Sequence, residues 1–503
     1  MSDICVASHH SSIAELLADK EFLGLANRDG FLVELRLDFY SDLSIANLDR
    51  ALKIFAPRAV VTCRHPDEGG KNPKLSDAER LSFLQHAADF GVAYIDIEAR
   101  TPHNQFRSGR SKLIVSFHDF QGGPHSMPDF DERLNKYPLH GIEKIAFVPL
   151  THADQMELVQ YCDLGQGIKH RKPGITLGMG EAGLWSRILA PLFNAPFSFA
   201  RGEGAPGTAP GQPTWRELDE LYRFRQMKPG WPVYGVIGNP IGHSLSPLMH
   251  NTALRELSRD GVYVPFKVDD NPVEFVEAFT AIGLRGVSIT IPHKEAAWEK
   301  IAELDSLARN IGAINTLNYR DGKWHATNTD AMAAADALES AAGSLAGKRV
   351  VILGAGGAAK AVAFGVKERG AEIFLLNRTR ERAETLAAAC GGRVITHAEL
   401  PAAKIDAIVN TTPIGMYPNV DASPLEKEQI PQGSIVFDTV YNPLRTKLLN
   451  LAAERGCKTV EGWTMFLGQG VRQFELWTGA KAPRAAMEKA VLGALTQRQA
   501  KQK

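Results

Sequence analysis

Eight short strand-like runs follow one another through the first half of this 503-residue chain. Separated by longer amphipathic segments, they read "ICVAS", "FLVELRL", "RAVVTCR", "VAYIDIE", "KLIVSFH", "EKIAFV", "GITLG" and "PFSFA". Strands that alternate with helices form right-handed βαβ units and a parallel sheet. Eight such units within residues 1–226 predict an α/β fold with a closed (β/α)8 barrel.

Several of these runs carry charged residues on one of their two faces. Successive side chains of a strand point to opposite faces, so one set enters the barrel and the other contacts the helices. The side chains that we predict to point inward are Glu34, Arg36, Thr62, Arg64, Asp96, Glu98, Ser116, His118, Lys144, Ala146 and Val148. A barrel interior is normally filled by branched aliphatic residues, and an unpaired buried charge costs roughly several kcal/mol. Charges that converge from consecutive strands therefore indicate a functional site.

Lys144 lies in the stretch "HGIEKIAFVPL" of residues 140–150. On one interpretation it is a strand-end lysine whose ammonium reaches solvent along its own stem. On the other it is a buried amine, because burial favours the neutral form that attacks carbonyls. The inward charges favour the second interpretation, with His118 of the preceding strand as general acid/base; the alternative for His118 is a capping or core histidine. Lys144 lies near the start of its strand, although barrel active sites lie at the C-terminal ends.

The motifs of this half resemble those of one enzyme family. "VELR", "TCRHPDEGG", "DIE", "SFHDF", "EKIAFVP", "GMGEAGLWSR" and "APGQ" occur in the order and spacing of type I 3-dehydroquinate dehydratases. The resemblance implies that Lys144 forms an imine with the substrate ketone. It implies that His118 removes the neighbouring proton and helps to expel the hydroxyl as water. It also implies a carboxylate-binding arginine at Arg187, whose planar fork suits an anion.

The same resemblance assigns the other substrate contacts of the barrel. They are Glu34, Arg36, Arg64, Thr208 and Gln212. Two positions depart from the family pattern, since Gly178 stands where serine is expected before "MG" and Thr208 where serine is expected before "APGQ". Threonine keeps the hydroxyl, and we expect neither departure to affect the chemistry.

A second architecture begins after "RQMKPGWPVYG" (residues 225–235), where prolines and glycines interrupt the helical pattern. Further on, "KRVVILGAGGAAKAVAFGV" indicates a buried strand, a glycine-rich turn and a helix. Gly354, Gly356 and Ala359 form a G-x-G-x-x-A pattern, which lets a pyrophosphate approach bare backbone at a helix N-terminus. Such turns also occur for packing reasons, so the pattern needs a supporting context.

The next strand-like run supplies that context. "AEIFLL" ends at Asn377-Arg378-Thr379-Arg380, where an acidic residue would bind the ribose hydroxyl of NAD. Arginines at this place suit the 2′-phosphate of NADP instead. The alternative is a solvated pair of surface arginines at a strand end, but the position favours NADP as the cofactor.

Ahead of the glycine-rich turn, hydroxyl and amide side chains recur in "YGVIGNPIGHSLSPLMHN", "GVSITIPHKEAAWEK" and "GAINTLNYRDGKWHATNTDA". Neutral donors suited to a polyol carboxylate are Ser244, Ser246, Thr290, Asn315 and Thr329. Lys294 and Asp330 are candidates for a charged pair. Carbonyl reduction leaves an alkoxide that must be protonated, so such a pair suits an acid/base role.

With "NTTPIGM", "DTVYNP" and "GWTMFLGQGVRQFELWTG", residues 232–495 resemble shikimate dehydrogenases. The resemblance makes Lys294 and Asp330 the catalytic pair. The substrate contacts that it implies are Ser244, Ser246, Ser288, Thr290, Asn315, Tyr441 and Gln469. The expected nucleotide contacts are Gly354, Ala355, Gly356, Gly357, Ala358, Asn377, Arg378, Thr379, Arg380 and Thr411. Leu245 stands where stand-alone members often have lysine. Ser288 stands where these members usually have asparagine. Serine at this position is similar to the fused plant-type enzymes, and it leaves quinate open as a substrate.

Together the halves predict a bifunctional enzyme that dehydrates 3-dehydroquinate to 3-dehydroshikimate and then reduces this product to shikimate with NADPH. The expected domains are the barrel at 1–226, a substrate-binding domain at 232–335 and 475–497, and a Rossmann domain at 336–474. One alternative is oxidation of quinate or shikimate with NAD(P) for catabolism. Another is a catalytically dead metabolite sensor, which predicts loss of the lysine or histidine, whereas both are present.

Composition argues against several other classes. Lys plus Arg and Asp plus Glu both number 57, so a formal net charge of zero gives no sign of a polyanion-binding surface. Five scattered cysteines without a CxxC pair argue against a disulfide framework or a zinc site. No apolar run approaches the roughly 18 residues of a membrane helix, and "ICVAS" follows the start almost directly. We therefore expect a cytoplasmic enzyme of small molecules without metal, nucleic-acid or membrane partners; the oligomeric state stays open, a monomer included.

Overall fold

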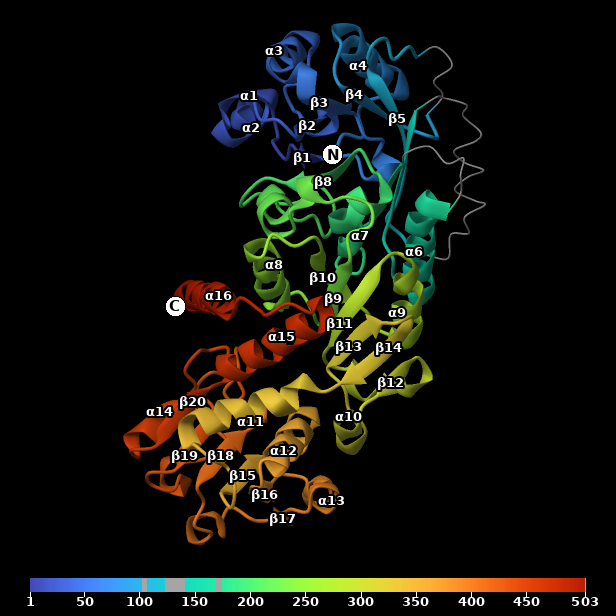
Figure 1. The fold of residues 1–503 in the computed structure, drawn as a ribbon. Helices are drawn as coiled ribbons and strands as arrows, with labels where there is room; N and C mark the ends of the chain where they lie inside the picture. Colours follow the sequence, from blue (N-terminus) through green and yellow to red (C-terminus); the bar gives the residue numbers. More distant parts are fainter. Residues whose placement is uncertain (102–105, 123–140, 168–173, 503) are drawn as a thin grey trace. The chain divides into compact units, whose positions relative to one another are not determined.

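The computed structural model describes residues 1–101, 106–122, 141–167 and 174–502 (Figure 1). The contacts between residues divide the chain into two units. The first is Met1–Val233 with Asp260–Leu284, and the second is Tyr234–Arg259 with Arg285–Lys503. A chain of this length exceeds one ordinary core, so more than one unit is expected.

The first unit is built on eight parallel strands, hydrogen-bonded in the order β7-β6-β5-β4-β3-β2-β1-β8. Because β8 pairs with β1, the sheet closes on itself except between β7 and β8, which share no ladder among the described residues. The strands are β1 (Asp3–Ala7), β2 (Phe31–Arg36), β3 (Ala59–Thr62), β4 (Tyr94–Glu98), β5 (Lys112–Asp119), β6 (Ile142–Phe147), β7 (Gly174–Gly178) and β8 (Phe197–Arg201). All eight predicted runs contain a strand, so the predicted barrel is confirmed.

Among the described residues, helices follow β1, β2, β3, β6 and β7, as the alternating pattern predicts. They are α1 (Ile13–Ala18), α2 (Lys20–Leu25), α3 (Ile45–Phe55), α4 (Asp77–Phe90), α6 (His152–Gly167) and α7 (Leu184–Leu189). Local caps fix their starts: Ser76 and Glu79 form a reciprocal capping box at α4, which satisfies two otherwise unpaired backbone donors. The first unit also contains β10 (Val262–Lys267) and α9 (Pro272–Ala281).

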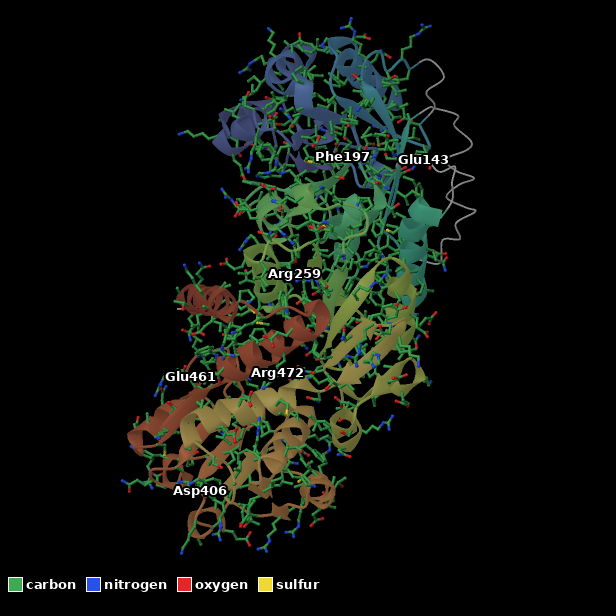
Figure 2. The ribbon with its side chains drawn as sticks, in the orientation of Figure 1. Glu143, Phe197, Arg259, Asp406, Glu461 and Arg472 are labelled. Carbon is green, nitrogen blue, oxygen red and sulfur yellow. The ribbon has the colours of Figure 1, made fainter. Side chains whose placement is uncertain are left out.

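The inward face of the barrel is apolar at its N-terminal end and charged above it. The buried apolar cluster comprises Cys5, Leu32, Val60, Ile114, Ala146, Ile175, Leu177, Phe197 and Phe199. Figure 2 labels Phe197, whose ring lies 5.1 Å from Tyr94 and 5.4 Å from Phe199, centroid to centroid. Since side chains alternate along a strand, the next inward positions after Leu32, Val60 and Ile114 are polar. On these three strands an apolar residue therefore separates the polar residues from the N-terminal mouth, whereas on β6 Ala146 of the cluster lies beyond Lys144.

In the second unit, six parallel strands form a sheet of order β17-β16-β15-β18-β19-β20, the Rossmann order. They are β15 (Arg349–Leu353), β16 (Glu372–Leu376), β17 (Arg393–Val394), β18 (Ala407–Asn410), β19 (Ile435–Asp438) and β20 (Lys458–Glu461). The helices of this region are α11 (Thr329–Ala342), α12 (Gly357–Glu368), α13 (Arg380–Cys390), α14 (Lys447–Glu454), α15 (Gly462–Thr478) and α16 (Arg484–Gln502). The predicted Rossmann fold is confirmed.

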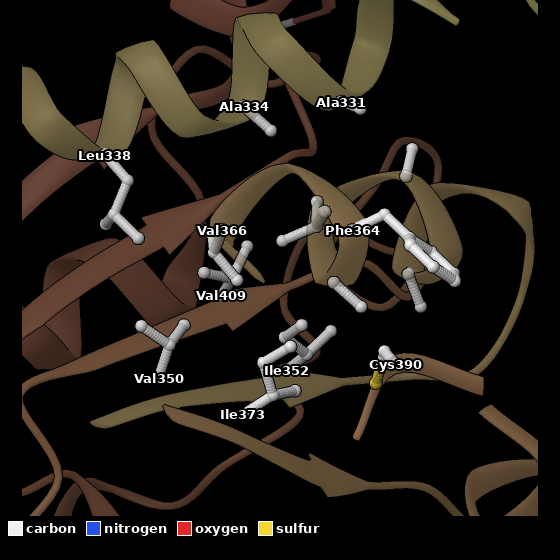
Figure 3. Packing of buried hydrophobic residues seen from close by; sticks show 14 of the residues in the cluster. Ala331, Ala334, Leu338, Val350, Ile352, Phe364, Val366, Ile373, Cys390 and Val409 are labelled. Carbon is white, nitrogen blue, oxygen red and sulfur yellow. The ribbon is translucent and has the colours of Figure 1, made fainter. Parts of the chain in front are cut away.

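Alternation along β15 shows how this sheet is covered on both faces. Val350 and Ile352 pack with Val366 of α12 and Leu338 of α11 (Figure 3). Val351 and Leu353 belong to the opposite cluster, which includes Leu448 and Leu449 of α14. A strand buried on both faces must be apolar at every position, which explains the continuous run "VVIL".

The second unit also contains a mixed sheet, in which β9-β11-β13-β14-β12 lie in that order. Its elements are β9 (Val233–Gly238), α8 (Ser246–Glu256), β11 (Leu284–Ile289), β12 (Ala302–Leu304), α10 (Ser306–Ile311), β13 (Thr316–Arg320) and β14 (Lys323–Thr327). β13 runs antiparallel to β11 and β14, whereas β12 is parallel to β14. In the described ranges, no helix combines the length and apolar character that crossing a bilayer requires.

Candidate active sites

Lys144 lies in the middle of β6 and points into the barrel. Its Nζ lies 2.9 Å from Asp96 Oδ2 on β4 and 4.0 Å from the ring centroid of Phe199 on β8. Only 4% of the residue is exposed, so the solvent-reaching interpretation is wrong. Lys144 is the second inward residue of β6, between Ile142 and Ala146.

Asp96 holds the lysine through a buried network. Arg64 Nη2 lies 2.9 Å from Asp96 Oδ2, and Ser116 donates a hydrogen bond of 2.5 Å to Asp96 Oδ1. Burial alone would raise the pKa of Asp96, but the charges of Arg64 and Lys144 outweigh it and leave the pKa well below its usual range. The network therefore presents Lys144 with a permanent carboxylate.

His118 lies two residues beyond Ser116 on β5. Its Nδ1 is 3.2 Å from Glu68 Oε2, and the same oxygen accepts a 3.1 Å hydrogen bond from the backbone N–H of His118. Burial, with the charges of Arg64 and Lys144, holds the pKa of His118 well below its ordinary value. Burial raises the pKa of Glu68 to about 8. A neutral imidazole fixed at one nitrogen can take up a proton at the other.

Eight sequence-predicted residues surround one cavity of about 50 Å³. They are Glu34, Arg36, Arg64, His118, Lys144, Arg187, Thr208 and Gln212. Arg187 of α7 is 2% exposed, and its buried Nε meets no acceptor among the described residues. Burial lowers its pKa to about 10. A buried donor without a partner calls for an explanation, and an anionic ligand supplies one.

The other predicted contacts are held in place by local bonds. Arg36 pairs with Asp38 through two hydrogen bonds of 3.0 and 2.8 Å. The hydroxyl of Thr62 donates a hydrogen bond of 2.8 Å to Glu34 Oε1. Gln212 Oε1 accepts from the backbone N–H of Thr208 at 2.7 Å and, more weakly, from its hydroxyl at 3.2 Å. The amide nitrogen of Gln212 is thereby directed away from these donors.

Gly178 departs from the family pattern for a steric reason. A Cβ at this position would lie 2.5 Å from both Gly183 Cα and Leu158 Cδ2. The backbone N–H of Gly178 donates a 2.7 Å hydrogen bond to Ser186 Oγ. Serine at position 178 would require the backbone of Gly183 to move, so this loop of the chain is matched to glycine.

The second candidate site is a larger cavity of about 350 Å³ in the second unit. Ten predicted residues line it: Ser244, Ser246, Ser288, Thr290, Lys294, Asn315, Asp330, Ala358, Tyr441 and Gln469. Lys294 Nζ lies 2.6 Å from Asp330 Oδ2, with 23% and 11% of the two side chains exposed. This is the charged pair that the sequence predicts, and it faces a cavity open enough for a ligand.

Neutral hydrogen bonds orient the polar wall of this cavity. Asn315 Oδ1 accepts from the backbone N–H of Thr329 at 2.7 Å, which fixes its amide orientation. Gln473 donates to the backbone carbonyl of Asn315 and to Thr316 Oγ1, at 3.1 and 2.9 Å. Ser288 donates a 2.8 Å hydrogen bond to Gln473 Oε1.

Sequence reasoning missed two residues that the structure brings to these sites. Glu68 of the motif "TCRHPDEGG" contacts His118. It lies in the short 3₁₀ turn Pro66–Glu68, where no strand alternation indicates the direction of its side chain. Gln473 lies one helical turn after Gln469 on α15 and lines the same cavity. The spacing of four residues on one helix was a usable signal for Gln473.

The glycine-rich turn fits a dinucleotide phosphate. Gly354 directly follows β15 and has φ +115°, and a Cβ there would lie 2.6 Å from Thr411 Oγ1. A Cβ at Gly356, the N-cap of α12, would enter open space that a ligand can use. The hydroxyl of Thr411 donates a hydrogen bond of 2.7 Å to the carbonyl of Leu353, which holds the ends of β15 and β18 together. Of the other predicted residues, Ala355 lies between Gly354 and Gly356, and Gly357 is the first residue of α12.

The predicted ribose-phosphate residues lie at the carboxyl end of β16. Three of them are exposed, namely Arg378, Thr379 and Arg380. Asn377 is half-buried, and its amide donates a hydrogen bond of 2.8 Å to the carbonyl of Thr379. Arg380 Nε lies 2.8 Å from Glu384, one turn along α13. Exposed arginines at this strand end leave charge for a phosphate.

No group of three or more metal-ligating side chains occurs in the part of the chain that the structure describes. Cys5, Cys63, Cys162, Cys390 and Cys457 are free thiols, and four of the five are buried. Neither candidate site is therefore arranged around a metal cluster of these residues.

A barrel with a buried lysine–carboxylate pair, followed by a Rossmann unit with an adjoining polar cavity, defines a fused lyase and dehydrogenase. Family models agree: type I 3-dehydroquinase matches residues 4–229, and shikimate dehydrogenase substrate binding domain matches 236–317. Shikimate / quinate 5-dehydrogenase matches 336–417, and the shikimate 5′-dehydrogenase C-terminal domain matches 462–492.

Full-length comparison places the chain more narrowly. A bifunctional 3-dehydroquinate dehydratase/shikimate dehydrogenase, chloroplastic, from Arabidopsis thaliana is 39% identical over 480 residues, covering 90% of this chain and 78% of the relative. A shikimate dehydrogenase (NADP(+)) from Methanothermobacter thermautotrophicus is 45% identical over 52% of this chain and 95% of its own. A crystal structure of a shikimate dehydrogenase in complex with NADP+ aligns with TM-score 0.51 and 37% identity, covering 53% of this chain and 96% of that chain. The chain belongs to the family of bifunctional 3-dehydroquinate dehydratase/shikimate dehydrogenases, which confirms the family and function predicted from the sequence.

Proposed function

We propose that the barrel dehydrates 3-dehydroquinate through an imine on Lys144. The observation that carries this is the buried Lys144–Asp96 pair with His118 on the adjacent strand. The amine of Lys144 condenses with the substrate ketone and releases water. The protonated imine then acts as an electron sink that acidifies the neighbouring C–H.

His118 completes the elimination as a general acid/base. Neutral His118 removes the proton beside the imine, the C–C double bond forms, and the β-hydroxyl leaves as water with the proton that His118 returns. Hydrolysis of the imine restores Lys144 and releases 3-dehydroshikimate. Arg187, with its unsatisfied buried Nε, anchors the substrate carboxylate. Arg36, Arg64, Glu34, Thr208 and Gln212 bind the ring hydroxyls and carboxylate.

In the second unit, 3-dehydroshikimate is reduced to shikimate. NADPH, when bound, supplies the reducing hydrogen to the carbonyl carbon. Lys294 and Asp330 hold the carbonyl oxygen and deliver its proton, since their side chains are 2.6 Å apart and face the cavity. The uncharged donors that line the cavity position the substrate, namely Ser244, Ser246, Ser288, Thr290, Asn315, Tyr441 and Gln469.

The Rossmann unit binds NADP through backbone and arginine contacts. The amides of Gly354, Ala355, Gly356, Gly357 and Ala358 receive the pyrophosphate at the start of α12. Arg378 and Arg380 receive the 2′-phosphate, with Asn377, Thr379 and Thr411 completing the nucleotide contacts. The domain division 1–226, 232–335 with 475–497, and 336–474 is part of this proposal.

The decisive experiment follows NADPH absorbance after addition of 3-dehydroquinate to the purified chain, with 3-dehydroshikimate as a parallel sample. Loss of absorbance in both samples supports two sites acting in series. Oxidation with 3-dehydroshikimate alone would contradict the barrel reaction. Oxidation in neither sample would contradict the reductase reaction, and direct measurement of 3-dehydroshikimate formation would then test the barrel.

A second candidate activity is oxidation of quinate by the same dehydrogenase site. Ser288 favours it, because its short side chain donates to Gln473 and leaves the cavity wall wider than asparagine would. Oxidation rates of quinate and shikimate with NAD and NADP separate the two roles. Shikimate oxidation with NADP should exceed every other combination, and faster quinate oxidation with NAD would support catabolism.

A further inference from the structure

Arg80 is a buried arginine of α4 that does not line the dehydratase cavity. Helix α4 packs outside β3 and β4 (Figure 1). Only 1% of Arg80 is exposed. Its Nε donates a hydrogen bond of 2.9 Å to the carbonyl of Cys63. Its Nη1 lies 2.5 Å from Asp77 Oδ1, and its Nη2 lies 2.5 Å from Glu98 Oε2. A buried arginine with three directed contacts has a defined position and a defined charge.

A line of alternating charges connects Arg80 to the reactive lysine. Glu98 Oε1 lies 3.2 Å from Arg64 Nη1, and Arg64 Nη2 lies 2.9 Å from Asp96 Oδ2. Asp96 Oδ2 in turn lies 2.9 Å from Lys144 Nζ. Each of these five residues is at most 4% exposed, so water screens none of the contacts strongly.

The charges along this line show what Arg80 contributes to the surroundings of Lys144. Asp77 is half exposed, so water screens its charge, and among the buried groups the two arginines balance the two carboxylates when the lysine is the neutral amine. If Arg80 lost its charge, the neutral amine would leave two carboxylates against one arginine. The remaining buried negative charge would then hold a proton on Lys144.

We propose that Arg80 is a positioning residue of the dehydratase, whose charge, passed through Glu98, Arg64 and Asp96, allows Lys144 to lose its proton and form the imine. The proposal rests on the imine role proposed above. Arg80 touches no substrate and acts only through the other residues of this line.

Other titratable groups face Lys144 from the elements around it. They are Cys5 of β1, Glu34 and Arg36 of β2, Glu68 of the 3₁₀ turn, His118 of β5 and Arg187 of α7. Glu34 and the Arg36–Asp38 pair stay unchanged when Arg80 is replaced. His118 and Glu68 are neutral partners near neutral pH, because their pKa values are displaced by burial. Their presence is common to wild type and variants, so the comparison isolates Arg80.

The test measures imine formation as a function of pH in the full-length chain. The enzyme is mixed with 3-dehydroshikimate and borohydride, and the mass of the reduced adduct on Lys144 is followed. Arg80→Met should shift the midpoint of trapping to higher pH by about one unit, which is a tenfold loss near neutral pH. Glu98→Gln removes a negative charge and should shift the midpoint to lower pH.

Opposite shifts distinguish electrostatic positioning from damage to the fold, which would move both variants the same way. The double variant Arg80→Met/Glu98→Gln should return close to the wild-type midpoint. Arg80→Lys keeps the charge and should also restore it, even where Arg80→Met folds poorly. Arg50→Met, an exposed arginine of α3, is the matched control, and shikimate dehydrogenase activity of each chain reports that the second unit is intact.

The outcomes separate this proposal from the imine itself. No adduct in the wild type would overturn the imine role and this proposal with it. A wild-type adduct with equal midpoints in the wild type, Arg80→Met and Glu98→Gln would overturn only the role of Arg80. Shifts of the same sign in both variants would overturn it as well.

Discussion

The two lysine–aspartate pairs around which we propose the two reactions, Lys144–Asp96 and Lys294–Asp330, contain the same residue types in contrasting environments. The first is almost completely buried, with Arg64 against the same carboxylate oxygen. In the second, 23% of the lysine and 11% of the aspartate side chain are exposed, and the surrounding donors are neutral.

The difference follows from what each site must do. A lysine that forms a covalent imine must lose its proton, so it needs burial and a controlled balance of nearby charge. A lysine that serves an alkoxide beside a cofactor needs only to hold and deliver a proton, because the cofactor carries the harder chemistry. In the proposed reactions, the same pair of residues acts as a nucleophile or as a proton donor according to its surroundings.

The sharpest test of this comparison removes the covalent lysine. Lys144→Met should lower dehydration by at least about 10³-fold, because no other amine can form the imine. Reduction of 3-dehydroshikimate should be unchanged. Separate assays of both reactions check this, with Lys53→Met on the exposed face of α3 as control. Retained dehydration would reduce the barrel lysine to an acid/base role like that of Lys294.

Removing the second lysine should be less severe. Lys294→Met should lower reduction by about 10²–10⁴-fold, the range for loss of a general acid, and leave dehydration unchanged. The exposed Lys323→Met is the matched control. The solvent isotope effect on the residual reaction should rise, since proton delivery now falls to water. An unchanged rate would show that the open pair is not the proton source.

Stability against pH should also differ between the units. Burial raises the pKa of Glu68 to about 8 from 4.5, so its contribution favours folding at low pH and is lost between pH 4.5 and 8. Glu68→Gln should remove this loss, roughly 2–5 kcal/mol across the window. Burial raises the pKa of Asp438 in the second unit only to about 6, so the loss there ends near pH 6.

Thermal inactivation of each activity measures this difference. Wild type and Glu68→Gln are heated at several pH values, and residual dehydration is compared with residual reduction. For dehydration, the gap between wild type and variant should widen in favour of the variant as pH rises to 8, and for reduction it should stay constant. A gap that does not change with pH would contradict the assignment of Glu68 as a buried, mostly neutral acid below pH 8.

The smallest expected effect concerns the nucleotide. Arg378→Ala with Arg380→Ala should raise the KM for NADPH about tenfold and leave the KM for NADH almost unchanged, because only NADPH carries the 2′-phosphate. Arg382→Ala, exposed on the same helix, is the control. Equal increases for both nucleotides would mean that these arginines act on the fold of α13 instead. The change in KM for NADPH measures how much nucleotide binding in the second unit depends on the charge of these arginines.

Much of the fold and of both sites could be predicted from the sequence. Period-two alternation in "FLVELRL" put Glu34 and Arg36 inside the barrel, and both line its cavity. Val148 was also predicted inward, but it lies beyond the end of β6 at Phe147, where strand alternation no longer applies. The G-x-G-x-x-A pattern located the turn at Gly354 because only a few residue types allow its backbone conformation.

The sequence by itself determined the eight barrel strands, the inward face of five of them and the nucleotide turn, because local periodicity and backbone conformation are properties of neighbouring residues. Only the tertiary structure decided that Lys144 meets Asp96, that Glu68 holds His118 and that Arg80 reaches Glu98. Alternation gives the face of a side chain but not its height in the barrel. That height depends on the stagger between strands, which closure of the whole barrel fixes.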